Sequence, residues 1–350
     1  MSVSLLDFIN NLIKIPSLLF TTILISAVMY INGCSDVPNA VATCVSTRSL
    51  TPKKALVLAA IFNFLGVLIM TFVSSKVAET VFNIVNFGEN TSSNLIALCS
   101  GLIGIVIWCI LAWLLGIPTS QSHALLAGIS GAAIALKGNF SGINFEEWKK
   151  VLYGLFIVNI LAFVIGLIIT KLIEKICKNM DRRKTNKFFE KTQIFGALTT
   201  CFMNGAQDGQ KYMAILLLGA SLSSGITKAT TFEIPVWLII YCSLMIALGA
   251  IIGGMKIIKT VGTKVSKVEK YQGTAADISS AVCLLGSSIL GIPVSSTHTK
   301  NSAVMGVGAS KRLSNVNWRT AKSMILAWIL TFPFCGLLGF AFTKVLIKIF

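Results

Sequence analysis

The chain has few charged residues. Of its 350 residues, 12% are charged and 55% are hydrophobic, whereas a soluble protein carries about a quarter charged residues. Acidic residues are especially scarce, with 13 aspartates and glutamates against 30 lysines and arginines. This composition excludes an ordinary soluble domain and predicts an all-α polytopic membrane protein. The net charge of +17 is typical of cytoplasmic loops that collect lysine and arginine, so nucleic-acid binding is not expected.

The sequence also lacks the motifs of common enzymes. The nine cysteines form no CxxC pair and stand at no metal-ligand spacing with the two histidines, so we interpret them as apolar packing residues. Neither HExxH nor GxSxG occurs, which argues against an intramembrane hydrolase. No Walker-type glycine loop is present, so ATP is not expected to drive the protein directly. We therefore predict no enzyme activity and no cofactor.

Two short polar phrases each occur twice. Gly-Ile-Pro-Thr-Ser-Gln-Ser-His occupies residues 116–123, Gly-Ile-Pro-Val-Ser-Ser-Thr-His occupies residues 291–298, and together they hold both histidines. A Gly-x-x-Asp element stands at nearly the same distance upstream of each, ending at Asp36 and at Asp208. A duplicated polar centre in an apolar chain is typical of membrane transporters built from two repeats.

Apolar stretches long enough to cross a bilayer follow the same order in both halves. The N-terminus has neither a basic region nor a cleavage site, so we expect the first stretch to be a retained span. The expected spans cover about residues 17–45, 55–74, 95–115 with a continuation to 136, 151–172, 194–222, 235–255, a stretch ending at 290 that the second Gly-Ile-Pro phrase follows, and a last stretch to 345. Polar residues interrupt the first stretch at 33–39 and its counterpart at 204–211, which predicts a broken helix in each half.

The basic residues predict sidedness. Residues 175–191 contain seven lysines and arginines, so this run is expected to be cytoplasmic. It divides the chain into a first repeat (1–176), a basic linker (177–193) and a second repeat (194–350).

Corresponding loops of the two repeats differ in charge. The loop at 76–93 is poor in basic residues and expected outside, whereas its counterpart after residue 255 is lysine-rich and expected inside. Five crossings in each half, with each Gly-Ile-Pro segment counted as one, satisfy this pattern. The predicted fold is therefore two inverted-topology repeats with broken helices and Gly-x-Pro re-entrant or half-helix segments, roughly 10–12 membrane segments in all, with both termini external.

Three aspartates lie within the expected spans: Asp36, Asp208 and Asp277. An ionisable group at membrane depth is costly and by default marks function. Asp36 and Asp208 are equivalent in the repeat, which favours a cation or proton site over simple caps of half-helices. Asp277 has no counterpart in the first half, and it either faces a cavity near the site or lies close to a helix end.

The Gly-Ile-Pro phrase has the composition of a helix N-terminus that binds an anion. Proline is tolerated in the first turn, serine caps it, and the free N–H groups carry partial positive charge. The hydroxyl donors are Ser120, Ser122, Ser295, Ser296 and Thr297. Two such N-termini meeting near the midplane would bind a tetrahedral oxyanion, although small hydroxyl residues also permit close helix packing.

The remaining polar residues have less specific signals. We expect His123 and His298 to support neighbouring helix ends, with proton shuttling as the alternative, because no ligand cluster accompanies them. Lys211 stands just after Asp208, and either balances the charge of an anion or pairs with Asp208. Lys300 is a weaker candidate of the same kind.

At these residues the sequence resembles the PiT family of inorganic phosphate transporters. That family has duplicated signatures close to Gly-Ala-Asn-Asp-Val-Ala-Asn-Ala and Gly-x-Pro-Val-Ser-Thr-Thr-His. The first pair matches residues 33–40 and 205–211, and the second pair matches residues 118–123 and 293–299. The resemblance covers nearly the whole chain and implies cation-coupled uptake of phosphate in a multi-pass protein of the cell membrane.

The resemblance also implies roles for particular residues. Phosphate would be held by the Ser/Thr residues of the two Gly-x-Pro signatures, and the coupling Na⁺ or H⁺ by the two Asp elements with Asn39 and Gln210 nearby. Gln121 departs from the pattern, since it replaces a small hydroxyl residue with an amide donor. Lys211 occupies the position equivalent to Asn39, so the two ion sites cannot be equivalent.

Two alternatives for the function, and the oligomeric state, remain open from the sequence. The same fold could carry sulfate or a related oxyanion, since hydroxyl and N–H donors suit both anions. A passive channel is distinguished from a transporter by saturable, gradient-dependent uptake. A homodimer is expected only from the general habit of membrane transporters, and the partners otherwise expected are phosphate and membrane lipid.

Overall fold

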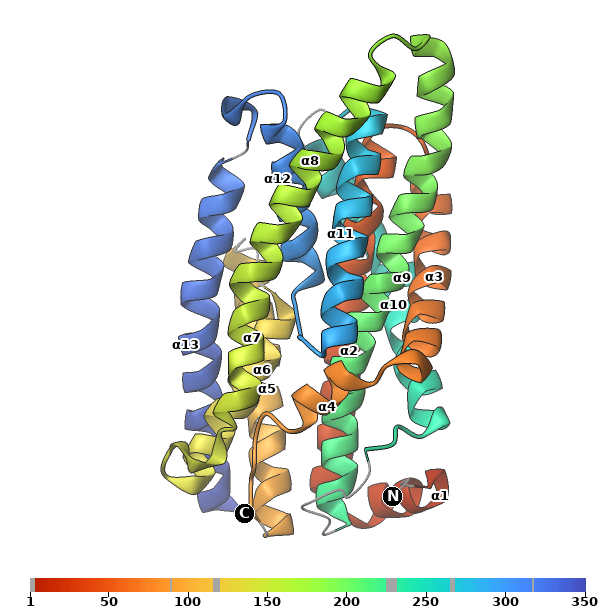
Figure 1. Ribbon diagram of the computed structural model, residues 1–350. Helices are drawn as coiled ribbons and strands as arrows, with labels where there is room; N and C mark the ends of the chain where they lie inside the picture. The colour runs from red at the N-terminus through yellow and green to blue at the C-terminus, as the bar shows by residue number, and fades with distance from the viewer. Residues whose placement is uncertain (1–3, 89, 116–119, 225–231, 265–267, 317) are drawn as a thin grey trace.

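The computed structural model describes residues 4–88, 90–115, 120–224, 232–264, 268–316 and 318–350. Among these residues the one β feature is an isolated bridge between Val85 and Ile143. The elements are α1 (Leu5–Lys14), α2 (Pro16–Ser46), α3 (Pro52–Val73), α4 (Lys76–Phe82), α5 (Thr91–Leu115), α6 (Gln121–Lys137), the 3-10 turn η1 (Phe140–Gly142), α7 (Phe145–Tyr153), the π-helical turn η2 (Gly154–Val158), α8 (Asn159–Cys177), α9 (Arg182–Ser223), α10 (Val236–Lys264), α11 (Lys270–Leu290), α12 (Ser296–Ala309), the 3-10 turn η3 (Leu313–Asn315) and α13 (Trp318–Ile349) (Figure 1).

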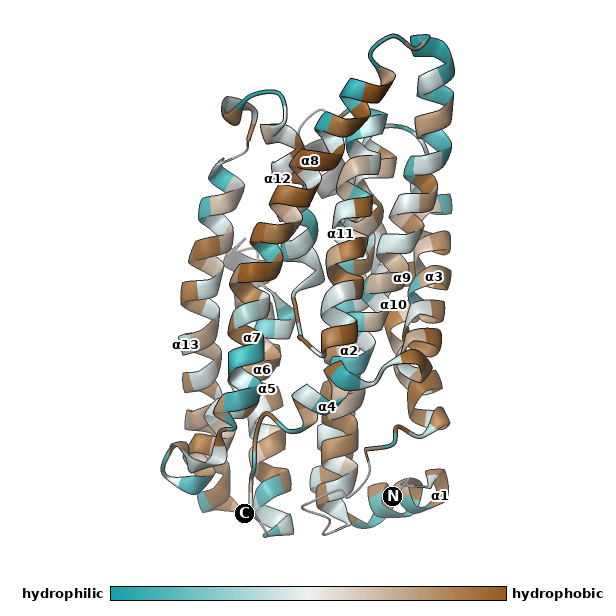
Figure 2. Ribbon diagram, in the orientation of Figure 1, coloured by the Kyte–Doolittle hydropathy of each residue, from teal (hydrophilic) through white to brown (hydrophobic). Residues whose placement is uncertain are grey.

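The helices form a bundle whose outer faces are apolar. In the described chain, seven helical stretches are long and apolar enough to cross a membrane. Apolar residues run along the middle of the outer helices, and polar residues gather towards the ends of the bundle (Figure 2). On α13, for example, Ile325, Leu326 and Ile329 are 50%, 52% and 62% exposed, as expected for side chains that contact lipid. The prediction of an all-helical multi-pass membrane protein is confirmed.

The prediction of a broken helix at each Gly-x-x-Asp element is wrong. α2 continues through residues 33–39, including Pro38, and α9 continues through residues 204–211. The reason is that the polar side chains face protein and not lipid: Asp36 and Asp208 are 8% and 1% exposed. Because both carboxylates accept hydrogen bonds from α12, the backbone need not open to satisfy them.

The basic segment between the predicted repeats is also more helical than expected. α9 begins at Arg182, inside the predicted linker 177–193, after Asp181 accepts a hydrogen bond from the Arg183 N–H at 2.8 Å. No glycine or proline follows before Gly196, so nothing ends the helix there. The boundaries of the repeats stay a prediction.

A break in helicity lies at the second Gly-Ile-Pro phrase instead. α11 ends at Leu290, Gly291 has a left-handed φ of 70°, and α12 begins at Ser296. α12 folds back along α11, since Lys300 forms an ion pair with Asp277. α5 and α6 fold back in the same way, with a Cβ on Gly101 only 3.0 Å from the Gly128 carbonyl oxygen. Residues 116–119 of the first phrase lie outside the described residues.

These two hairpins revise the expected crossing count. We counted each Gly-Ile-Pro segment as one crossing, but each returns along the preceding span. In the described chain, each half contributes one hairpin and three other long spans: α2, α3 and α7–α8 in the first half, and α9, α10 and α13 in the second. The number of full crossings per half is still odd, so the charge argument for inversion survives.

Close helix crossings recur at equivalent positions of the two halves. A Cβ on Gly33 would lie 2.0 Å from the Ile246 carbonyl oxygen, and one on Gly205 would lie 2.1 Å from that of Asn63. Each half therefore packs its Asp-bearing helix on the following helix of the other half, α2 on α10 and α9 on α3. α2 and α9 run in opposite directions, because Gln193 near the start of α9 contacts the end of α2. Both observations support an inverted repeat.

The ends of the bundle differ in charge. α1 and the end of α13 lie at one end, and the basic turn between α8 and α9 lies at the other (Figure 1). This separation is the one expected if the termini are external and the basic run is cytoplasmic. The orientation in the membrane stays a prediction.

The crossings predict which glycines are essential for stability. Gly66→Ala and Gly249→Ala place a Cβ 1.9 Å and 2.1 Å from the carbonyl oxygens of Phe202 and Tyr30. We expect each to lower the free energy of unfolding by about 1–3 kcal/mol through overpacking. Thermal unfolding in detergent measures this. Gly286→Ala is the control: its Cβ meets nothing within 4 Å, so it should be neutral or slightly stabilising. Equal stability in all three variants would contradict the account.

Candidate functional site

Lys211 of α9 lies where the two hairpins meet. Its side chain is fully buried, and its ammonium donates to Asp208 Oδ1 at 2.8 Å, to Ser122 Oγ at 2.9 Å and to the Val294 carbonyl. Ser122 belongs to the first hairpin, whereas Val294 belongs to the second. All three ammonium donors are therefore used, and one side chain links α9 to both Gly-Ile-Pro hairpins.

Asp208 completes this contact. Its Oδ1 accepts from Lys211, and its Oδ2 accepts from Ser296 Oγ at 3.0 Å. The pair is separated by three residues on α9, so the two side chains lie on the same helix face. A buried carboxylate without a partner would be very costly. Lys211 therefore serves as the fixed counter-charge of Asp208.

Asp36 is the repeat equivalent of Asp208 but has a different environment. Its Oδ1 accepts from Thr297 Oγ1 at 3.0 Å and from Ser35 Oγ at 3.3 Å, and its Oδ2 accepts from Asn32 Nδ2 at 2.9 Å. Within the described residues, no lysine or arginine forms an ion pair with it. The two equivalent carboxylates thus differ in one respect: only Asp208 has a built-in positive charge.

The N-termini of α6 and α12 are built alike. Ser120 and Ser295 cap them, accepting from the His123 and His298 N–H groups at 3.4 Å each. In the described chain, no acceptor contacts the backbone N–H groups of Ser296 and Thr297. Free N–H groups at a helix start are anion-binding donors. The predicted anion-binding residues of the two hairpins are therefore brought to one buried place around Lys211.

Gln121 joins the hairpin to both Asp-bearing helices. Its Nε2 donates to Ser35 Oγ at 3.1 Å, and its Oε1 accepts from Tyr212 at 3.5 Å. The amide that replaces the usual hydroxyl thus lies beside Asp36. This position keeps it within the predicted site.

Among the described residues, Asn39 and Gln210 form no hydrogen bond with these carboxylates. Gln210 donates to the Ser74 carbonyl at 2.7 Å and accepts from the Ala78 N–H at 3.3 Å, so its amide holds the turn before α4. No hydrogen bond of the Asn39 side chain occurs in the part of the chain that the structure describes. The predicted participation of these two residues in an ion site has no support from their contacts.

His123 and His298 form an aromatic contact between the repeats. Their ring centroids are 5.3 Å apart, and the His298 Nδ1 accepts from Trp328 Nε1 at 2.9 Å. His123 also stacks on Phe332 at 5.1 Å. Both rings thus pack against α13, an arrangement that favours the supporting role over proton shuttling.

Asp277 lies outside this site. It forms an ion pair with Lys300 of α12, and Thr43 donates to its Oδ1 at 3.4 Å. Asp277 lies inside α11 and not at its end, and its contacts do not place it at a cavity. Its partner Lys300 stands one turn after the start of α12 and forms no hydrogen bond with the residues around Lys211 in the described chain.

Sequence reasoning missed two asparagines. Asn32 and Asn204 stand four residues before Asp36 and Asp208, and both are buried with an Oδ1 that has no hydrogen-bond partner. An unpaired amide oxygen beside a buried carboxylate is a natural ligand for a hard cation. Their equal spacing in both copies was the signal in the sequence.

Gln207 was also missed, although it lies inside the second Gly-x-x-Asp element. Its Nε2 donates to Ser287, Ser288 and the Ile292 carbonyl, and its Oε1 accepts from the Val294 N–H at 3.3 Å. It therefore fixes the tip of the second hairpin against α9. This explains why a long amide stands here and Ser35 stands in the first copy.

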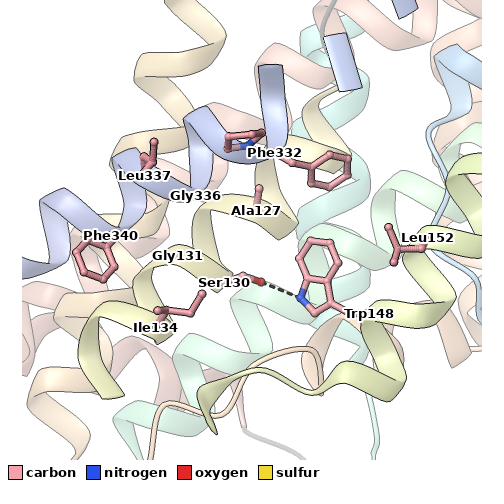
Figure 3. A pocket seen from close by; sticks show the side chains of 11 residues that line it. Ala127, Ser130, Gly131, Ile134, Trp148, Leu152, Phe332, Gly336, Leu337 and Phe340 are labelled. Carbon is pink, nitrogen blue, oxygen red and sulfur yellow. Dashed lines mark hydrogen bonds between the residues drawn. The ribbon is translucent and has the colours of Figure 1, made fainter. Parts of the chain in front are cut away.

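A separate cavity of about 720 Å³ lies between α6, α7 and α13. It is lined by apolar and small residues, and its one described polar contact is the bond from Trp148 Nε1 to Ser130 Oγ at 3.0 Å (Figure 3). No charged residue lines it, so it does not suit an anion. The described residues also contain no cluster of histidine, cysteine and carboxylate groups that would hold a metal ion.

The described helices form a membrane bundle with two facing hairpins, whose helix N-termini converge on a buried polar centre. Sites of this kind are typical of membrane transporters. The chain belongs to the phosphate transporter family, whose family model matches residues 32–339. This confirms the resemblance found in the sequence and the prediction that the protein is not an enzyme.

Several known proteins are similar to the chain over most of its length. A probable low-affinity inorganic phosphate transporter of Bacillus subtilis is 38% identical and aligns over 92% of this chain and 96% of its own. One of Mycobacterium bovis is 34% identical over 93% of this chain and 76% of its own. A solved structure, "The sodium-dependent phosphate transporter", is 22% identical, has a TM-score of 0.85 and covers 96% of this chain and 100% of its own. At this identity the solved structure establishes the fold alone.

The buried ion pair predicts a specific pattern of stability. Lys211→Met and Asp208→Asn should each lower the free energy of unfolding by about 3 kcal/mol or more, because each leaves an uncompensated buried charge. The double variant should lose much less than the sum, since no charge remains. Unfolding of the purified protein measures the cycle. Lys149→Met, which removes an exposed pair with Glu146, is the control and should change little. Additive losses in the double variant would contradict the assigned pairing.

Proposed function

We propose that the protein is a secondary transporter that moves inorganic phosphate across the cell membrane, coupled to Na⁺ or H⁺. The observation that carries this proposal is the meeting of the two hairpin N-termini at Lys211. There, hydroxyl groups, free N–H groups and one ammonium surround a buried point reached from both repeats. The names of the relatives support phosphate as the substrate.

Binding of phosphate at this point requires only local changes. Ser296 and Thr297 now donate to Asp208 and Asp36, and rotation of these hydroxyls would turn them towards an anion. The Ser296 and Thr297 N–H groups need no rearrangement, because they already lack acceptors. Gln121 and Ser122 would contribute from the first hairpin. Ser120 and Ser295 serve as caps and hold the two helix ends in place.

The aspartates favour phosphate over sulfate. Hydrogen phosphate keeps a proton that it can donate, whereas sulfate has none at neutral pH. An ionised aspartate at the site, such as Asp208 with its charge balanced by Lys211, would accept that proton in a hydrogen bond, whereas sulfate has no proton to offer. Sulfate or a related oxyanion carried by the same fold is the second candidate, supported by the hydroxyl donors alone.

Coupling follows from the unequal environments of the two aspartates. Asp208 is already neutralised by Lys211, whereas Asp36 would repel phosphate when ionised and unpaired. A proton or Na⁺ at Asp36 would remove that repulsion, with the free oxygen of Asn32 as an additional ligand for Na⁺. The anion therefore binds well only together with the cation, and this is the requirement for symport.

Alternating access would come from movement of the intertwined repeats around this site. In this arrangement the termini face the outside and the basic turn between α8 and α9 faces the cytoplasm. Lipid covers the apolar outer helices. A homodimer stays a prediction on which no contact of the described chain bears.

The proposal predicts gradient-driven uptake that depends on Asp36. Purified protein in liposomes should accumulate radiolabelled phosphate when a Na⁺ or H⁺ gradient is imposed separately, with little competition from sulfate. Asp36→Asn should lower uptake about tenfold or more and remove its dependence on the gradient, because the cation site is lost. Asp7→Asn, which changes an exposed aspartate of α1, is the matched control and should transport normally.

Two other results would change the conclusion. Strong competition by sulfate would assign the substrate to the second candidate. Uptake that depends on neither gradient and is equal in the parent and in Asp36→Asn would identify a passive pathway, and symport would be rejected.

A further inference from the structure

A second buried ion pair lies away from the central site. Asp277 of α11 and Lys300 of α12 are 0% and 4% exposed and form an ion pair with each other. Like the Asp208–Lys211 pair, this pair occurs only in the second half: by the spacing of the two histidines, the position equivalent to Lys300 is Leu125. The proposed transport site makes no use of it.

This pair is much less satisfied than the central one. Lys211 has three hydrogen-bond partners, whereas Asp277 is the one hydrogen-bond acceptor found for the Lys300 ammonium in the described chain. The Asp277 Oδ2 has no partner at all. Buried charges are normally fully hydrogen-bonded, since each unmet donor or acceptor is costly. Within the described residues, two ammonium donors and one carboxylate oxygen of the pair are therefore available to a further partner.

The pair lies between the central site and the basic end of the bundle. Thr43, which donates to Asp277, follows Asp36 by seven residues on α2, about 10 Å along the helix. Thr200 donates to the Asp277 carbonyl at 3.0 Å and precedes Asp208 by eight residues on α9, about 12 Å. α2 and α9 run in opposite directions, so both threonines lie on the same side of the aspartates.

The pair joins the second hairpin to both Asp-bearing helices. Asp277 contacts α2 through Thr43 and α9 through Thr200, and Gly196 packs against it, with a Cβ there only 3.0 Å from that of Asp277. Lys300 holds α12 to the same point. Four helices, α2, α9, α11 and α12, therefore meet at this pair.

We propose that the Asp277–Lys300 pair is the inner gate of the transport path, and that Lys300 binds phosphate as it leaves the central site. When the pair opens, the Lys300 ammonium exchanges the Asp277 carboxylate for a phosphate oxygen. The anion then moves from the hairpin N-termini beside Lys211 to the ammonium of Lys300 and onwards to the basic end. This inference rests on the proposed function and adds a second station for the same substrate.

Two native cysteines report on this level of the bundle. Cys44 follows Thr43 and Cys201 follows Thr200, both are fully buried, and the Cys44 thiol donates to the Gln193 carbonyl of α9 at 3.4 Å. Opening of the gate must expose at least one of them. Cys242 on α10 is buried to the same extent and is not part of the gate, so it reports on general loosening.

The first measurement uses the unaltered protein in lipid nanodiscs. A membrane-impermeant maleimide is added with and without inorganic phosphate and the coupling cation, and mass spectrometry of the peptides locates the modified thiols. We expect phosphate with the cation to raise modification of Cys44 or Cys201 several-fold and to leave Cys242 unchanged. Modification of the two cysteines that does not respond to phosphate would overturn the gate.

The second measurement separates a gate from a structural contact. Lys300→Met combined with Asp277→Asn removes both charges of this pair and leaves neither partner with an unpaired charge, so it should fold. We expect its affinity for phosphate to stay within about twofold of the parent and its net uptake to fall about tenfold or more. The maleimide should modify Cys44 of this variant even without phosphate. Parent-like uptake in this double variant would overturn the proposal. Lys270→Met, which removes a half-exposed pair with Glu190, is the matched control and should transport normally.

A conservative variant covers the case in which the neutral double variant does not fold. Lys300→Arg keeps the positive charge and should retain phosphate-dependent modification of Cys44 with reduced uptake. Loss of that response in a folded Lys300→Arg protein that transports normally would contradict the gate. A parent protein that neither binds nor transports phosphate would instead refute the proposed function itself.

Discussion

The contact on which the rest of the structure depends is the ammonium of Lys211 between the two hairpins. It meets Asp208 on its own helix, Ser122 at the start of α6 and the Val294 carbonyl just before α12. Burying a lysine is costly unless its charge is matched and its donors are satisfied. The partners of Lys211 therefore bring Ser122 of α6 and Val294, just before α12, to one point of α9. The same convergence brings the free N–H groups of α12 and the hydroxyl groups of both phrases together.

The site is symmetric in shape and asymmetric in charge. Equivalent glycines set the same helix crossings in both halves, and equivalent serines cap both hairpins. The charges break this symmetry, because Lys211 and Lys300 both belong to the second half. In the proposed mechanism, the symmetric frame allows one repeat to move against the other, and the unequal charges leave Asp36 as the carboxylate that a coupling cation neutralises. In this account the fold allows the movement of the repeats, and the lysines determine which cations accompany phosphate.

The sequence predicted the outline of this structure well and its local detail less well. Composition and span length predicted the helical membrane bundle, because it depends on long apolar runs. The duplicated Gly-Ile-Pro phrases predicted two similar helix N-termini. The prediction of broken helices at Asp36 and Asp208 was wrong. The polarity of a segment does not show whether another helix supplies the hydrogen-bond partner of its carboxylate. The pairing of Asp277 with Lys300 and the diversion of Gln210 to the Ser74 turn depend on contacts between distant segments. The spacing of Asn32 and Asn204 was visible in the sequence.

The central claim is that Lys211 acts as a permanent cation in place of a transported one. The number of cations that accompany each phosphate tests it most directly, and it is measured from the potential at which net flux in liposomes reverses. Lys211→Asn places in the second repeat the same residue type that the first repeat has at the equivalent position, Asn39. This variant should transport one more cation per phosphate than the parent. The same ratio in the parent and in this variant, with transport intact in both, would contradict the account.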